Sequence, residues 1–138
     1  MRPALLLLAT SLSALALGQA GVTGRWTTID DSSGKPRSVV EITERHGRLF
    51  GHIVDLYDKS DAGKRCTKCP GDRNNAPIVG LEIIRDMEAG EDLWHNGTIL
   101  DPETGKVYTC KLWLEGGMLK VRGYVAFLYR TQTWVRGR

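Results

Sequence analysis

Alanine is scarce in most of this sequence. After position 20 the only alanines are Ala62, Ala76, Ala89 and Ala126, and no long segment repeats hydrophobic residues at the helical period of 3.6. These absences argue against a mainly helical fold. The charges nearly balance, at 19 Lys and Arg against 16 Asp and Glu, with no long run of one sign. That balance gives no reason to expect a nucleic acid or an anionic membrane as partner.

The hydrophobic residues concentrate instead at the start of the chain. A short positive end, Met1-Arg2-Pro3, precedes an apolar run from Ala4 to Leu17, and small residues flank Gln19. This layout predicts a secretory signal peptide over residues 1–20, cleaved after Ala20, and one domain over residues 21–138. A retained anchor is the alternative, but the run is shorter than the roughly 20 residues that span a bilayer. No cysteine follows the cleavage site, so we expect a periplasmic or secreted protein that is not a lipoprotein.

Short alternating segments between turn residues fill the rest of the chain. Such segments predict β-strands, and the turns between them carry glycine, aspartate or proline. The strands are expected at Gly24–Ile29, Arg37–Glu44, Arg48–Leu56, Val79–Arg85, Leu93–Leu100, Lys106–Leu114, Met118–Val125 and Leu128–Arg136. Asp86–Asp92 is compatible with one helical turn. Asn96-Gly97 is interpreted as a turn rather than as part of a glycosylation site.

Eight short strands with mostly tight turns predict an all-β fold. The most economical closure is a small antiparallel up-and-down barrel, which leaves no exposed edge strand. A two-sheet β-sandwich is the alternative. An eight-stranded barrel either fills its interior with side chains or holds one small ligand.

The two ends of the domain carry complementary motifs. Gly24-Arg25-Trp26 opens the first strand, and Arg130-Thr131-Gln132-Thr133-Trp134 lies in the last. This pairing resembles the ends of lipocalins and related calycins, in which a cation from the final strand covers the tryptophan of the first. The resemblance implies barrel closure by Trp26 and Arg130, with Arg136 as the alternative cation.

Further motifs extend a resemblance over almost all of residues 21–138. The chain resembles the bacterial exported family called domain of unknown function 2147, which implies a small exported domain of Gram-negative bacteria but no reaction and no ligand. The matching stretches are Gly24-Arg25-Trp26, Cys66-Thr67-Lys68-Cys69, Pro77-Ile78-Val79-Gly80-Leu81, Ile99-Leu100-Asp101-Pro102-Glu103-Thr104-Gly105-Lys106, Leu119-Lys120-Val121-Arg122-Gly123-Tyr124 and Arg130-Thr131-Gln132-Thr133-Trp134.

A long segment without a strand pattern, residues 57–76, contains two of the three cysteines. Loops of this length are uncommon in compact domains unless they are functional or disordered. In an exported protein Cys66, Cys69 and Cys110 first suggest a disulfide, either Cys66–Cys69 or one of this pair with Cys110. A redox-active dithiol at Cys66 and Cys69 is a second interpretation, although Pro70-Gly71 stops any helix there. A zinc site of three cysteines and a histidine is the third.

Three hypotheses of function follow. The first is non-catalytic binding of a small apolar or amphipathic ligand in the barrel, with Arg122, Tyr124, Gln132 and Trp134 as candidate binding residues. The second is a cell-envelope protein-interaction domain that uses the loop of residues 57–76. The third is a thiol–disulfide or zinc site at Cys66 and Cys69. No catalytic constellation stands out, so we do not favour an enzyme and expect no cofactor, no bound metal and no nucleic-acid partner.

Overall fold

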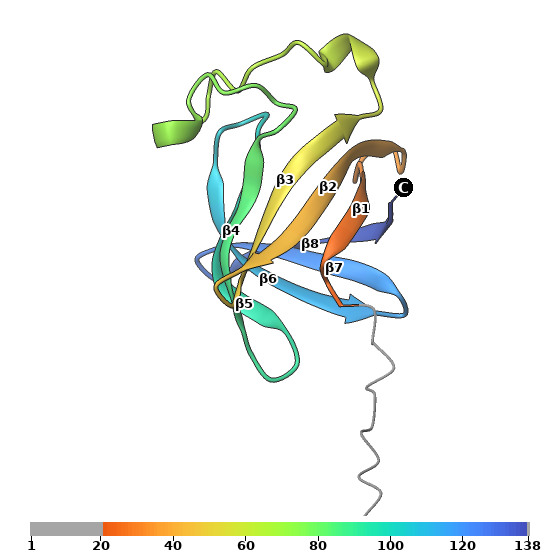
Figure 1. Ribbon diagram of the computed structural model, residues 1–138, viewed down its shortest axis with the longest axis vertical. Helices are drawn as coiled ribbons and strands as arrows, with labels where there is room; N and C mark the ends of the chain where they lie inside the picture. The colour runs from red at the N-terminus through yellow and green to blue at the C-terminus, as the bar shows by residue number, and fades with distance from the viewer. Residues whose placement is uncertain (1–20, 138) are drawn as a thin grey trace, which may run out of the picture.

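A computed structural model describes residues 21–137, which form a closed antiparallel barrel of eight strands in chain order (Figure 1). The predicted signal peptide, residues 1–20, lies outside the described residues. Within residues 21–137 no helix is long and apolar enough to cross a membrane. The strands are β1 Gly24–Ile29, β2 Pro36–Arg45, β3 Arg48–Leu56, β4 Glu82–Ala89, β5 Trp94–Leu100, β6 Val107–Glu115, β7 Met118–Val125 and β8 Leu128–Arg136; two short 3₁₀ turns, η1 Lys59–Asp61 and η2 Gly71–Arg73, lie between β3 and β4.

Tight turns join most neighbouring strands, and their backbone angles explain the residues found there. His46-Gly47 and Gly116-Gly117 have positive φ at both positions, which matches the twist of a two-residue hairpin. The barrel closes where β1 pairs with β8, through Trp26 opposite Arg136 and Thr27 opposite Val135. The predicted all-β barrel is therefore confirmed, and the alternative sandwich is not the fold adopted.

The interior is packed tightly at one end of the barrel. Large apolar side chains from six strands are almost fully buried there: Trp26, Ile42, Leu49, Ile84, Met87, Leu112 and Leu119. The N-terminal end of β1 and the β2–β3, β4–β5 and β6–β7 connections lie at this closed end. The β1–β2, β3–β4, β5–β6 and β7–β8 connections lie at the opposite, open end, where the β3–β4 segment rises above the strands (Figure 1).

The fourth strand differs from the sequence prediction. We expected Val79–Arg85 and a helical turn after it, whereas β4 runs from Glu82 to Ala89. Asp86 has a φ of 57°, and the pairing with β3 shifts register nearby, so the strand continues through a β-bulge. This bulge lets Met87 be fully buried, which a solvated helical turn would not achieve.

The predicted turn at Asn96-Gly97 is also wrong, because both residues lie inside β5. Asn96 has a φ of 59° and the pairing of β5 with β6 shifts there, so the Asn-Gly pair forms a second bulge. A Cβ atom at Gly97 would overlap the Met87 side chain and the Arg85 carbonyl. The glycine is thus required by close packing rather than by a chain reversal.

The cation that covers Trp26 is Arg136, the alternative, and not Arg130. The Arg136 guanidinium lies 3.8 Å from the centre of the Trp26 ring and donates hydrogen bonds to the carbonyls of Thr23 and Gly21. Arg130 lies six residues earlier on β8, near the open end, where it pairs with Asp31 at 3.0 Å. The reason is register: Arg136 is the β8 residue opposite Trp26.

Candidate functional site

A cavity of about 350 Å³ occupies the open half of the barrel. It extends from the buried Trp134 ring to the β1–β2 and β5–β6 turns. Cavities that bind small molecules in proteins begin at about this size. The barrel interior is therefore packed in one half and hollow in the other.

Apolar and polar side chains line the cavity in nearly equal measure. The apolar side chains that line it are Ile53, Ile83, Ile99, Leu100, Val121 and Trp134, with Tyr108 beside Gly123. A side chain at Gly123 would come within van der Waals distance of Tyr108, so the glycine contributes to the open space.

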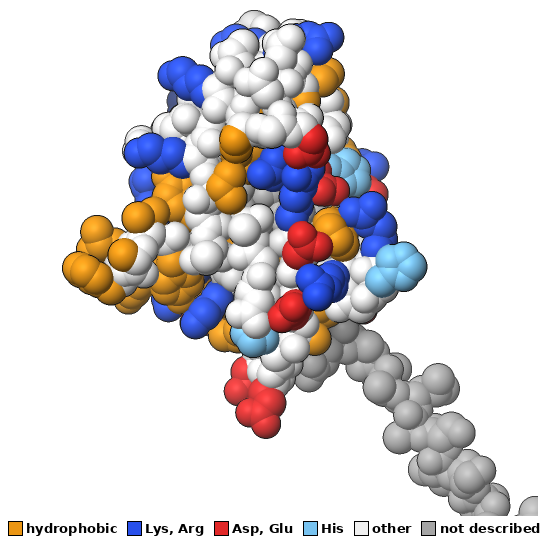
Figure 2. All heavy atoms as spheres, turned by 90° about the vertical axis from the view of Figure 1, so that its left-hand side faces the viewer, with side chains coloured by type: hydrophobic (Ala, Val, Ile, Leu, Met, Phe, Trp, Pro, Cys, Tyr) orange, Lys and Arg blue, Asp and Glu red, His pale blue; other side chains and the backbone are white. Residues whose placement is uncertain are grey.

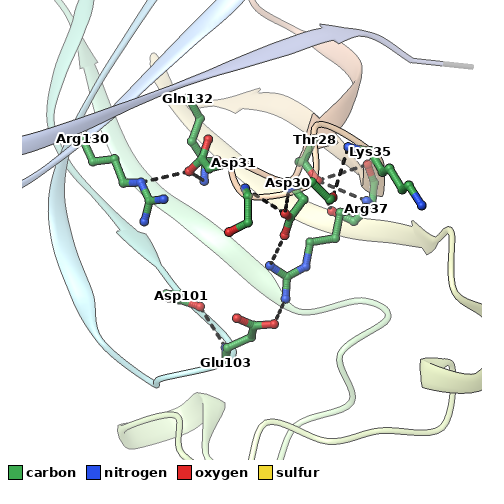
Figure 3. A network of polar contacts seen from close by, with 12 residues as sticks. Thr28, Asp30, Asp31, Lys35, Arg37, Asp101, Glu103, Arg130 and Gln132 are labelled. Atoms are coloured by element: carbon green, nitrogen blue, oxygen red, sulfur yellow. Dashed lines mark hydrogen bonds and ion pairs between the residues drawn. The ribbon is translucent and has the colours of Figure 1, made fainter.

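The mouth of the cavity is polar and centred on Asp31 (Figure 3). The Asp31 carboxylate pairs with Arg130 at 3.0 Å and accepts a hydrogen bond from the Gln132 amide at 3.2 Å. Gln132 in turn accepts a hydrogen bond from the Trp134 indole at 2.9 Å. This chain of contacts connects the β1–β2 turn to the deepest aromatic ring of the cavity.

A second ion-pair group closes the other side of the mouth. Arg37 of β2 lies between Asp30 of the β1–β2 turn and Glu103 of the β5–β6 turn, and it pairs with both (Figure 3). Hydrogen bonds from Ser33, with smaller contributions from Ser32 and Arg37, lower the pKa of Asp30, so this carboxyl is ionised at neutral pH. Arg37 therefore links two turns that lie at the open end.

The structure divides the four predicted ligand-binding residues into two pairs. Gln132 and Trp134 line the cavity. Arg122 and Tyr124 point to the outside of the barrel, since they alternate with the inward Val121 and Gly123. Three further residues of the mouth carry no sequence pattern that predicts a binding role, since Asp31 and Glu103 lie in turns and Arg37 lies at the start of a strand. Arg130, expected at Trp26, is the fourth.

The loop between β3 and β4 forms a wall of a second cavity of about 370 Å³. Asp61, Lys64 and Thr67 of the loop line it, together with Arg37 and Glu103, which also line the first cavity. The Arg37–Glu103 pair therefore stands between the two spaces. The loop is held to β4 by Arg85, whose guanidinium pairs with Asp72 at 2.7 Å and with Glu82 at 2.6 Å.

The cysteines of the loop form a disulfide, Cys66–Cys69, with Cα atoms 5.4 Å apart. Both are almost fully buried, and Cys110 lies alone and buried on β6. Burial raises the pKa of the Cys110 thiol to about 12, so it is protonated at neutral pH. In residues 21–137 no group of three or more His, Cys, Asp or Glu side chains is arranged to hold a metal ion.

A closed eight-stranded barrel with an internal cavity open at one end defines a lipocalin-like architecture. Among solved structures, the protein HP1028 from the human pathogen Helicobacter pylori, described as belonging to the lipocalin family, is similar in fold, with a TM-score of 0.74 and 20% sequence identity. The match covers 86% of this chain and 84% of that one. At this identity the similarity establishes the fold alone.

The family model described as an uncharacterized protein conserved in bacteria, DUF2147, matches residues 24–136, and the chain belongs to that family. No curated protein matches the sequence.

Proposed function

We propose that this chain is exported by its first 20 residues and binds a small apolar or amphipathic molecule in the barrel cavity without catalysing a reaction. The observation that carries the proposal is the hollow open half of the barrel, about 350 Å³ lined by both apolar and polar side chains. An empty apolar space forfeits packing contacts that a filled core would have, so its presence favours a ligand.

The polarity of the cavity supports an amphipathic ligand. Apolar side chains surround the deep part, whereas Asp31, Arg130 and Gln132 surround the mouth. A molecule with an apolar body and a polar end matches this gradient, because its body replaces contacts with water and its polar end stays hydrogen-bonded.

The loop of residues 57–76 fits the same function as a wall of the adjoining cavity. Opening of the Arg37–Glu103 pair would join the two spaces and admit a longer ligand. The disulfide constrains the segment 66–69 of this loop and so reduces the entropy lost when a ligand binds against it. An exported, oxidising location such as the Gram-negative periplasm is consistent with that disulfide.

A volume substitution tests the proposal directly. Val121→Phe replaces a small aliphatic side chain in the cavity with an aromatic ring. Because the ring fills part of the cavity, we expect the variant to bind the fluorescent probe 8-anilinonaphthalene-1-sulfonate roughly tenfold or more weakly than the wild type. Val135→Phe makes the same chemical change on the outward face of β8, where Val135 is 38% exposed, and should bind the probe as the wild type does.

Equal probe binding by Val121→Phe and the wild type would contradict the cavity as the binding site. Native mass spectrometry of protein purified from the periplasm provides a second readout, with an adduct expected on the wild type and absent from Val121→Phe. Circular dichroism of both variants checks that the barrel is intact.

A further inference from the structure

The tip of the β7–β8 hairpin is a run of exposed apolar side chains. Phe127 is 88% exposed, Leu128 66%, Tyr129 60% and Val125 55%. Single exposed hydrophobic residues are ordinary, but a continuous group of large ones at a protruding turn marks an interaction site. Figure 2 shows hydrophobic side chains protruding at one edge of the molecule, with Lys and Arg side chains close behind them.

Behind the tip, on the outer face of the barrel, aromatic rings alternate with cations. The Arg122 guanidinium lies 4.2 Å from the centre of the Tyr129 ring and 4.8 Å from that of Trp113. Lys111 lies 5.3 Å from the Tyr124 ring, which is 5.7 Å from Tyr129. Tyrosine, tryptophan, lysine and arginine are the residues that proteins place at the level of lipid headgroups, because each joins an apolar body to a polar end.

Cations outnumber carboxylates on this face. Lys111, Lys120 and Arg122 lie on it, and its carboxylate, Glu115, accepts a hydrogen bond from the Trp113 indole at 3.2 Å. Lys120 and Arg122 donate to the hydroxyls of Thr133 and Thr131, and in the described part of the chain neither they nor Lys111 form an ion pair. The near-neutral total charge of the chain does not reveal this local excess of cations.

We infer that the β7–β8 hairpin docks the barrel on an anionic phospholipid surface, with the apolar tip among the acyl chains and the aromatic and cationic layer among the headgroups. Apolar burial and attraction to anionic lipids together determine the strength of such peripheral binding. A second copy of the chain is the less suitable occupant, because a two-fold contact would place the same cationic face against itself.

The position of the hairpin connects docking to the cavity. Val125 and Leu128 form the last pair of the β7–β8 ladder, directly beyond Gly123 and Arg130, which line the cavity. A barrel docked by this tip therefore has the β7–β8 side of the cavity mouth near the bilayer.

Vesicle co-sedimentation tests the inference. The wild type should sediment with vesicles of phosphatidylcholine and phosphatidylglycerol, and less with phosphatidylcholine alone. Phe127→Asp should reduce the partition roughly tenfold or more, because the tip loses its largest apolar side chain. Met118→Asp, a matched change of an exposed apolar residue at the opposite end of the barrel, should leave partition unchanged.

A second pair of variants tests the cationic layer. Lys111→Gln and Arg122→Gln should each weaken binding to the phosphatidylglycerol vesicles about fivefold and leave the weak binding to phosphatidylcholine unchanged. Added salt should produce the same loss in the wild type. Val121→Phe should still sediment with the vesicles, so that failure of ligand binding and failure of docking are distinguishable.

Either of two results would overturn the inference. One is equal sedimentation of Phe127→Asp and the wild type. The other is a wild type that does not sediment with the vesicles but forms a dimer in sedimentation velocity, while Phe127→Asp is monomeric. That result would make a second copy of the chain the occupant of the tip.

Discussion

At the scale of single residues, the clearest structural role belongs to Arg136. Its guanidinium covers the Trp26 ring and donates to two carbonyls of the segment before β1. The β1–β8 seam contains only two paired positions, whereas β7 and β8 pair at seven. One side chain therefore adds contacts where the barrel has fewest.

We expect Arg136→Ala to lower the free energy of unfolding by about 1–2 kcal/mol, as the cation–π contact and the hydrogen bonds are lost together. Arg130→Ala removes the same side chain from the same strand but breaks only an exposed ion pair, so it should cost at most about 1 kcal/mol. Urea unfolding of both variants measures the difference. A larger loss in Arg130→Ala than in Arg136→Ala would assign the closing role to Arg130.

At the scale of elements, the sequence predicted strands better than it predicted irregularities within them. Seven strands have nearly the expected bounds, because alternation reports which face of a strand is buried. Both errors, at Asp86–Asp92 and at Asn96-Gly97, fall on bulges. A bulge uses the same positive-φ residues as a turn, so the local sequence cannot distinguish a strand that continues from one that reverses.

The same limit explains what was missed in the candidate site. Gln132 and Trp134 were found because they alternate on one strand. Their neighbour Asp31 comes from a turn 101 positions away from Gln132, and only barrel closure brings the two together. The outward direction of Arg122 and Tyr124 likewise depends on which face of β7 the closed barrel places inside.

The bulge in β5 gives a prediction at this scale. Gly97→Ala places a methyl group against the Met87 side chain and the Arg85 backbone, and we expect a loss of about 1–3 kcal/mol in unfolding free energy. Gly63→Ala, in the β3–β4 loop where a Cβ meets no atom within 4 Å, is the matched control and should have little effect. Thermal unfolding of the two variants compares them. Equal stability would contradict the close packing of the two bulged strands.

The ion pair between Asp72 of the loop and Arg85 of β4 contributes to stability in a way that depends on pH. The direction of that dependence follows from the pKa of Asp72. Hydrogen bonds from Arg85 lower the pKa of Asp72 below the ordinary value of 3.8. Because its pKa is depressed in the folded state, Asp72 stabilises the fold above that ordinary value, and the contribution is lost as pH falls through the depressed pKa. Asp72→Asn should therefore be less stable than the wild type at pH 7 and equally stable at strongly acidic pH.

Urea midpoints measured from pH 7 downward would show this convergence beginning at roughly pH 4. Arg85→Gln provides the background for a double-mutant comparison, in which adding Asp72→Asn should no longer change the pH dependence. A difference between Asp72→Asn and the wild type that stayed constant down to the acid limit would show that the carboxyl does not act through its ionisation.

At the scale of the whole molecule, the tightly packed interior and the cavities are located at opposite ends of the barrel. The closed end contains the fully buried residues Leu49, Leu112 and Leu119, while the open end contains both cavities, the long loop and the exposed hairpin tip. A binding site needs space and some mobility at its entrance, and both reduce local stability. We therefore expect the packed half of the barrel to supply the stability that the hollow half lacks.

Amide hydrogen exchange should reveal this gradient. Amides of β6 and β7 near the closed end are expected to exchange only through global unfolding, because both strands are paired on either side over most of their length. Amides of the exposed part of the loop, residues 57–65, should exchange fastest, and those of β1 at an intermediate rate, since its contact with β8 is short.

A bound ligand should slow exchange in the loop and in the β1–β2 turn while leaving β6 and β7 at their closed ends unchanged, because only the open half contacts the cavity. Protection that was uniform along the chain, or a ligand effect concentrated at the closed end, would contradict this division of the barrel into a structural half and a binding half.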